Sequence, residues 1–246
     1  MLRIFIGWDS RFPEAADVLR YSLLKQATIP LEIHYLKLVD LDLLRPRDPL
    51  ASTECAYARF LVPYLCNYRG KAMFLSSDTL CLADVREIDQ LDMVSYALRI
   101  VEHRYSPSQV MNVHGCLQNA YPRKNWSSPM LMDCSKLRLW TREAVESYPA
   151  AYFERFQDIP GEQIGEIPWR WSALDALDQT AKLVHFASGT PRSGRLSSSP
   201  HATLWARFRD DMLAAADAAR HCRTDSAASL GDALLATCDS PALAAH

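Results

Sequence analysis

The sequence predicts an α/β protein with a mostly parallel central sheet flanked by helices. Residues 2–6 form a short apolar segment, a helical pattern follows, and residues 31–38 form a second apolar segment. This β-α-β order is typical of parallel strands joined by a right-handed crossover. Two further apolar segments deliver a carboxylate, Asp78, and an imidazole, His185, to their ends. Ligands bind at the carboxyl ends of parallel strands, so we expect these two side chains to lie together.

The N-terminal elements follow from apolar runs and helix signals. Strand 2–6 ends at Gly7-Trp8-Asp9, which supplies a turn and an acid. Pro13 opens a helix to about residue 27, because proline is favoured at a first helical turn. The strand expected at residues 31–38 completes the unit.

The middle of the chain supplies the remaining elements of the sheet. After a proline-containing loop, a helix is expected from Ser52 to about Leu65, weakened or kinked at Pro63. The later strands are expected at residues 72–75, 93–101, 129–132 and 184–186, with a helix over residues 136–148.

The C-terminal segment changes in composition. Residues 1–213 are expected to form one domain, followed by an Ala/Ser/Asp-rich tail over residues 214–246 that is partly disordered. A helix is expected at residues 202–220, and residues 224–246 are expected to be weakly ordered.

Composition limits the classes of function. Of 246 residues, 49% are hydrophobic and 23% charged, with a net charge of −2, which fits a soluble globule and does not indicate nucleic-acid binding. The seven cysteines lack paired CxxC spacing, which favours reduced thiols over disulfides or a cysteine zinc site. No signal-peptide core or transmembrane-length apolar run is found, so we expect a cytoplasmic protein.

Asp78 and His185 are candidate ligands of one divalent cation. Mg²⁺ or Mn²⁺ neutralises a leaving diphosphate in many transfer reactions, and imidazole suits Mn²⁺ better than Mg²⁺. Two alternatives stay open from the residues alone. Asp78 could serve as a turn or cap acid, and His185 could be a hydrogen-bonded core histidine.

Five segments, in this order, resemble the family 8 glycosyltransferases. They are Phe5-Ile6-Gly7-Trp8-Asp9, Ser52-Thr53-Glu54-Cys55-Ala56-Tyr57-Ala58-Arg59-Phe60, Phe74-Leu75-Ser76-Ser77-Asp78, Lys124-Asn125-Trp126-Ser127-Ser128 and Val184-His185-Phe186-Ala187-Ser188-Gly189. The resemblance covers roughly residues 2–190. It implies a single GT-A (Rossmann-like) domain, a nucleotide-sugar donor, generally UDP-linked, transfer with retention, and a metal held by an Asp-x-Asp motif and a histidine.

Carried over by position, the resemblance implies Asp9 near the uridine or ribose and Arg59 near the donor, although Arg59 could equally form a structural ion pair. It implies Asp78 as the second acid of the metal motif and His185 as a further ligand. The motif is degenerate, because Ser76 stands where the first acid is usual. This replacement removes one negative charge from the expected Mn²⁺ or Mg²⁺ site.

Further donor contacts are expected from Ser76 and Ser77 of the motif, and from Asn125 and Ser127 before the strand at 129–132. A plain strand-entry turn is the alternative for the last two. Past His185, the family's usual lysine or tryptophan is absent. Arg192 or Arg195 could hold the diphosphate instead, or be solvated loop arginines.

Two sets of residues bear on the sugar itself. Trp169 and Trp171 could stack on a sugar face, although core packing is the commoner use of tryptophan. Asp158, Glu162 and Glu166 occupy the region where the related enzymes place an acid near the reacting sugar, and none is assigned as the nucleophile.

These features predict a glycosyltransferase that transfers a hexose from a UDP-sugar to a saccharide or glycolipid acceptor, in polysaccharide biosynthesis. The alternative is a catalytically inactive GT-A domain that acts as a nucleotide-binding or scaffold partner, and Ser76 is its support. Contact of the tail with a membrane surface is left open, because its arginines are offset by Asp210, Asp211 and Asp217.

Overall fold

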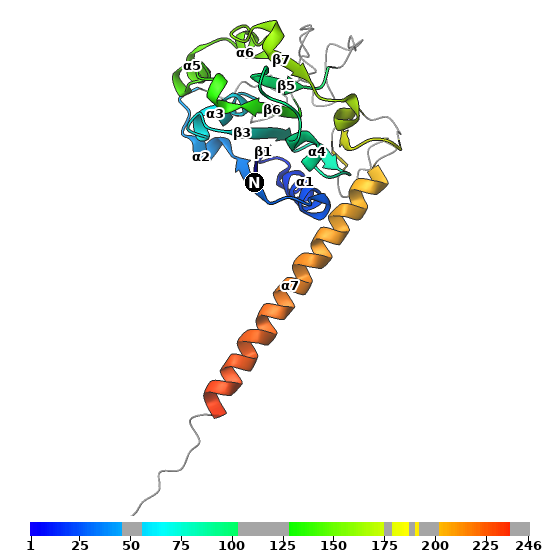
Figure 1. The fold of residues 1–246 in the computed structure, drawn as a ribbon. Helices are drawn as coiled ribbons and strands as arrows, with labels where there is room; N and C mark the ends of the chain where they lie inside the picture. The colour runs from blue at the N-terminus through cyan, green and yellow to red at the C-terminus, as the bar shows by residue number, and fades with distance from the viewer. Residues whose placement is uncertain (46–55, 103–127, 175–178, 187–189, 192–201, 237–246) are drawn as a thin grey trace, which may run out of the picture.

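A computed structural model describes residues 1–45, 56–102, 128–174, 179–186, 190–191 and 202–236 (Figure 1). Its centre is a six-stranded sheet with helices on both faces, which confirms the predicted α/β class. In spatial order the strands are β2 (Leu31–Leu36), β1 (Leu2–Gly7), β3 (Lys71–Ser76), β6 (Met130–Asp133), β5 (Leu98–Ile100) and β7 (Ile164–Glu166).

The central sheet is mostly parallel, as predicted, and its register brings two strand ends together. β1 pairs in parallel with β2 and β3, and β5 pairs in parallel with β7. β6 runs antiparallel to both of its neighbours. Gly7 at the end of β1 lies opposite Ser76 at the end of β3, so the segments that follow both strands leave the sheet at the same edge.

Two helices differ in extent from the predicted ones. The helix expected from Ser52 to Leu65 is, in its described part, a 3-10 turn, η1 (Ala58–Leu61), followed by α3 (Val62–Leu65). Pro63 lies in the first turn of α3, where its missing N–H is tolerated, so a new helix begins there. The helix expected at residues 136–148 is shorter, because α5 (Arg142–Ser147) begins at its Thr141 cap.

The other helices are α1 (Pro13–Gln26), α2 (Leu38–Leu41), α4 (Arg86–Asp89), η3 (Cys134–Lys136), α6 (Ala150–Glu154), η4 (Gly161–Gln163), η5 (Trp169–Ser172) and α7 (Ala202–Ala236). None of the helices in the described ranges combines the length and the apolar run that a membrane span requires.

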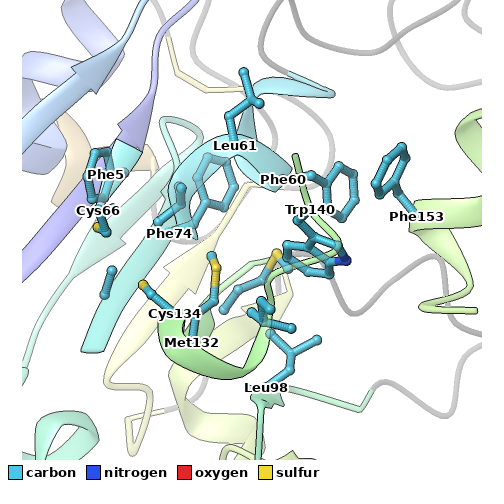
Figure 2. Close-up of a cluster of buried hydrophobic side chains, with 14 of the residues drawn as sticks. Phe5, Phe60, Leu61, Cys66, Phe74, Leu98, Met132, Cys134, Trp140 and Phe153 are labelled. Carbon is cyan, nitrogen blue, oxygen red and sulfur yellow. The ribbon is translucent and has the colours of Figure 1, made fainter. Parts of the chain in front are cut away.

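Alternate residues of β3 supply two hydrophobic cores, one on each face of the sheet. Ala72 and Phe74 belong to a cluster beneath η1, α3 and α5, which Figure 2 shows around Phe60, Trp140 and Phe153. Met73 and Leu75 belong to a second cluster, beneath α1. Successive side chains of a strand point to opposite faces of the sheet, so a strand that is buried on both faces contributes alternate residues to two cores.

A second, three-stranded sheet lies beside the first and corrects one expectation. It contains β4 (Thr79–Cys81), β9 (Leu183–His185) and β8 (Ala173–Leu174) in that order. The strand with His185 was expected in the central sheet, but it pairs antiparallel with β4 instead. A third core cluster packs this small sheet against α1 and α7.

α7 is longer than the helix expected at residues 202–220, since it continues to Ala236 and includes part of the segment expected to be weakly ordered. Trp205 and Phe208 are buried against the body of the protein, and Lys25 of α1 forms an ion pair with Asp211 at 2.6 Å. Beyond this contact the helix runs away from the sheet (Figure 1). The boundary at residue 213 stays a prediction.

Candidate functional site

Asp78 and His185 lie next to each other at the junction of the two sheets. A two-residue turn, Ser77-Asp78, links β3 to β4, and the Thr79 hydroxyl donates to the Ser76 carbonyl at 2.8 Å within it. Thr79 pairs with His185 across β4 and β9, and the Phe186 N–H donates to the Asp78 carbonyl at 2.9 Å. These bonds bring His185 Nε2 to 3.5 Å from Asp78 Oδ1.

The Asp78 carboxylate is partly enclosed and is held in its charged form. Its side chain is 29% exposed and that of His185 is 20% exposed, so solvent and small ligands reach both. Oδ1 itself is buried without a hydrogen-bond partner. Burial raises the pKa of the Asp78 carboxyl, but interactions with His185 and Ser76 lower it by more, so the pKa lies below its ordinary value.

Ser172, which sequence reasoning did not identify, contacts the other nitrogen of His185. Its hydroxyl is buried at the end of η5 and lies 3.4 Å from Nδ1. A partner at Nδ1 orients an imidazole and leaves Nε2 directed at Asp78. Its sequence context, after Trp171, carries no signal of this role.

The donor set fits one divalent cation. Ligand atoms bound at right angles to an ion at about 2.1 Å lie about 3 Å apart, close to the separation of Asp78 Oδ1 and His185 Nε2. A buried carboxylate oxygen without a hydrogen bond, such as Asp78 Oδ1, is an atom that a cation can satisfy. No cluster of three or more His, Cys, Asp or Glu residues occurs in the described part of the chain.

Ser76 and Ser77 are buried beside Asp78. The Ser76 N–H donates to the Ser128 hydroxyl at 3.0 Å, which ties the end of β3 to the residue before Pro129. Ser128 was not among the predicted site residues. The signal that could have found it is the serine pair that precedes β6.

Asp9 is buried near the same edge of the sheet, because it follows β1. Arg11 holds both of its carboxylate oxygens, with Nε at 2.8 Å from Oδ1 and Nη2 at 2.6 Å from Oδ2. This bidentate pair fixes the loop after β1. Arg11 is a second residue that sequence reasoning missed.

Arg59 packs on the face of the sheet that Phe74 occupies. Its guanidinium carbon lies 5.1 Å from the centre of the Phe74 ring, and Nε donates to the Ala56 carbonyl at 3.0 Å. The side chain is buried, and Phe74 is two residues before Ser76 on the same face of β3. Arg59 therefore lies beneath the strand end that carries the Ser76-Ser77-Asp78 motif.

The remaining candidates separate into several groups. Asn125, Ser127, Arg192 and Arg195 lie outside the described residues. Trp171 is buried in the core, whereas Trp169 is 46% exposed. Glu162 and Glu166 are exposed, and burial raises the pKa of the Asp158 carboxyl.

The fold is that of GT-A-type glycosyltransferases. LgtC, a galactosyltransferase solved with donor and acceptor sugar analogs, superposes with a TM-score of 0.55 at 12% identity, covering 85% of this chain and 95% of that one. GlyE of Streptococcus pneumoniae TIGR4 gives a TM-score of 0.55 at 10% identity over 84% of this chain, which spans only 59% of GlyE. At these identities the likeness defines the class of fold.

A closer relationship appears in sequence. Protein CDI of Arabidopsis thaliana is 36% identical over 217 residues, which cover 82% of this chain and 84% of that protein. The chain therefore belongs to the same family as Protein CDI. No protein-family model matches it.

Proposed function

We propose that this protein is a glycosyltransferase that takes a hexose from a nucleotide sugar, UDP-linked, and transfers it with retention to a saccharide or glycolipid acceptor. The observation that carries the proposal is the pair formed by Asp78 and His185, 3.5 Å apart, with a buried and unbonded Oδ1. The GT-A-type fold and the segments that resemble family 8 enzymes support it.

Asp78 and His185 are the residues that would hold Mn²⁺ or Mg²⁺ in this proposal. The ion would supply positive charge to the diphosphate as it leaves the sugar. The lowered pKa of Asp78 keeps a ligand oxygen ionised near neutral pH. Ser172 contacts Nδ1 of His185, which leaves Nε2 as the nitrogen that would bind the ion.

Ser76 gives the site less negative charge than two aspartates would. A hydroxyl is a weaker ligand than a carboxylate for a hard cation. We therefore propose a metal site of reduced affinity that is completed by the diphosphate itself. Arg59, beneath the motif, and the loop that Arg11 fixes through Asp9 are the proposed supports of the donor.

Calorimetric titration with UDP tests this function, first with Mn²⁺ and then with the metal chelated. We expect binding that depends on Mn²⁺ and that falls at least about tenfold in Asp78→Asn and His185→Ala. Asp210→Asn is the matched control, since Asp210 lies on α7 with 63% of its side chain exposed. Hydrolysis of UDP-glucose and UDP-galactose then identifies the donor, and NMR of the released sugar gives the anomeric outcome.

Two results would argue against the proposal. If the affinity for UDP changes neither with the metal nor with the Asp78 and His185 substitutions, the proposed metal site is wrong. That result would favour a catalytically inactive nucleotide-binding domain. An absence of binding under either condition would favour the scaffold role.

A further inference from the structure

One exposed aromatic side chain lies beside the candidate site. Of the tryptophans in the described ranges, Trp140, Trp171 and Trp205 are buried and Trp8 is partly buried beneath Lys37. Trp169, at the start of η5, is 46% exposed. An exposed indole keeps a broad apolar face accessible to a ligand.

The short helix η5 connects Trp169 to Ser172 of the candidate site. In a 3-10 helix the side chains at positions i and i+3 lie in line, and each residue rises about 2.0 Å. Trp169 and Ser172 are in this relation, so their side chains share one side of η5, about 6 Å apart along its axis. The Ser172 hydroxyl contacts His185, so Trp169 lies one turn of η5 from a residue of the candidate site.

One hydrogen bond closes the turn of η5 and another joins η5 to Lys182, so the exposed indole lies on a fixed support. The Trp171 N–H donates to the Pro168 carbonyl at 2.9 Å, and the Lys182 N–H donates to the Arg170 carbonyl at 2.8 Å. Trp171 anchors the helix in the core beneath α1. A rigid aromatic surface binds with little loss of conformational entropy.

We propose that Trp169 is the acceptor platform, on which a neutral pyranose ring of the acceptor stacks with its apolar C–H face against the indole. The inference deepens the proposed function and rests on it. An indole offers a broad apolar face with a hydrogen-bonding edge, which matches a sugar ring that has C–H groups on one face and hydroxyls around its rim. The acceptor hydroxyl would then be turned toward the sugar that leaves the diphosphate near Asp78.

The test uses the full chain labelled with ¹⁵N, saturated with UDP and Mn²⁺, and follows the indole N–H signals. The Trp169 signal is identified by its loss in Trp169→Phe. The probes are the methyl pyranosides of β-glucose, β-galactose and α-mannose. We expect one of them to shift the Trp169 signal saturably.

Variants then measure the contribution of the ring. Trp169→Ala is expected to weaken binding of that pyranoside about tenfold, the loss expected for about 1.4 kcal/mol of stacking and burial. Trp169→Phe, which keeps a smaller aromatic face, is expected to restore part of it. Leu213→Ala is the control, because Leu213 on α7 is also 46% exposed, and it is expected to change nothing.

Separate outcomes overturn this inference and the proposed function. If UDP binds with Mn²⁺ and no methyl pyranoside moves the Trp169 signal, the acceptor platform is wrong and the transferase stands. A response to octyl but not to methyl β-glucoside would assign the indole to a lipid chain and overturn the proposal. If UDP does not bind at all, the transferase fails, and with it the acceptor role of Trp169.

Discussion

Single residues set the chemistry at the Asp78 site. The Asp78 carboxylate, the His185 imidazole and Ser76 all lie within one turn and one strand pair. Sequence reasoning identified Asp78 and His185, because a polar residue at the end of an apolar strand is conspicuous. It missed Ser172 and Arg11, since buried hydroxyl contacts and local ion pairs leave no pattern along a chain.

The charge at position 76 should control metal affinity. Ser76→Asp adds a carboxylate two residues before Asp78, at a buried position beside it, so Mn²⁺ is expected to bind at least about tenfold more tightly in the presence of UDP. Calorimetry measures this, and Ser135→Asp, a serine of η3 away from the motif, is the control. Equal Mn²⁺ affinity in Ser76→Asp and wild type would remove Asp78 from the metal site.

The lowered pKa of Asp78 makes a signed prediction about acid stability. A carboxyl whose pKa is lower in the folded state stabilises the fold above its unfolded pKa, ordinarily 3.8, and loses that contribution as the pH falls through the folded value. The advantage in Tm of wild type over Asp78→Asn should therefore shrink as the pH falls below about 4. Thermal melts from pH 6 to pH 3 measure it; a difference that does not depend on pH would contradict the assignment.

At the scale of elements, strand pairing rather than strand order explains the site. Asp78 and His185 were expected together on one rim of a parallel sheet, and they do meet, but through an antiparallel pair of a second sheet. Apolar runs locate strands, but they do not say which strand each will pair with. An apolar run also does not show where pairing begins and ends. Residues 93–101 were therefore predicted as one strand, although β5 contains only Leu98–Ile100.

The edge pair of β5 and β7 depends on a glycine. A Cβ at Gly165 would lie 2.8 Å from Tyr96 Cδ1 and 3.0 Å from Arg99 Cγ, where the Arg99 guanidinium stacks on Tyr96. Gly165→Ala is therefore expected to lower the free energy of unfolding by about 1–3 kcal/mol.

Gly161→Ala is the matched control in urea unfolding, because nothing lies within 4 Å of its Cβ. It should leave stability unchanged or raise it by up to about 1 kcal/mol. Equal effects of the two substitutions would show that β7 is not packed as described.

At the scale of the whole molecule, α7 combines a packed start with a projecting remainder. Trp205 and Phe208 complete the third core cluster, and the helix then leaves the body (Figure 1). The sequence predicted the start of this helix at residue 202, where it begins. It predicted the end too early, because an alanine-rich segment without a packing pattern reads equally as tail or helix.

A truncation after Leu213 should therefore leave the domain folded. We expect its Tm to lie within a few degrees of the full chain, whereas Trp205→Ala should cost about 3–5 kcal/mol through loss of a buried ring. Calorimetric melting measures both. A truncated chain that unfolds at much lower temperature would move the domain boundary beyond residue 213.

The place of His185 on β9 also has a consequence for the order of folding. About a hundred residues separate Asp78 from His185, so closing that loop is among the entropically costly steps, and early chain fragments cannot contain the pair. A divalent ion bound by both would hold together two segments that are far apart in the sequence. The free energy of ion binding would then add to the stability of the folded domain. The appearance of metal binding during refolding would show that Asp78 and His185 have come together.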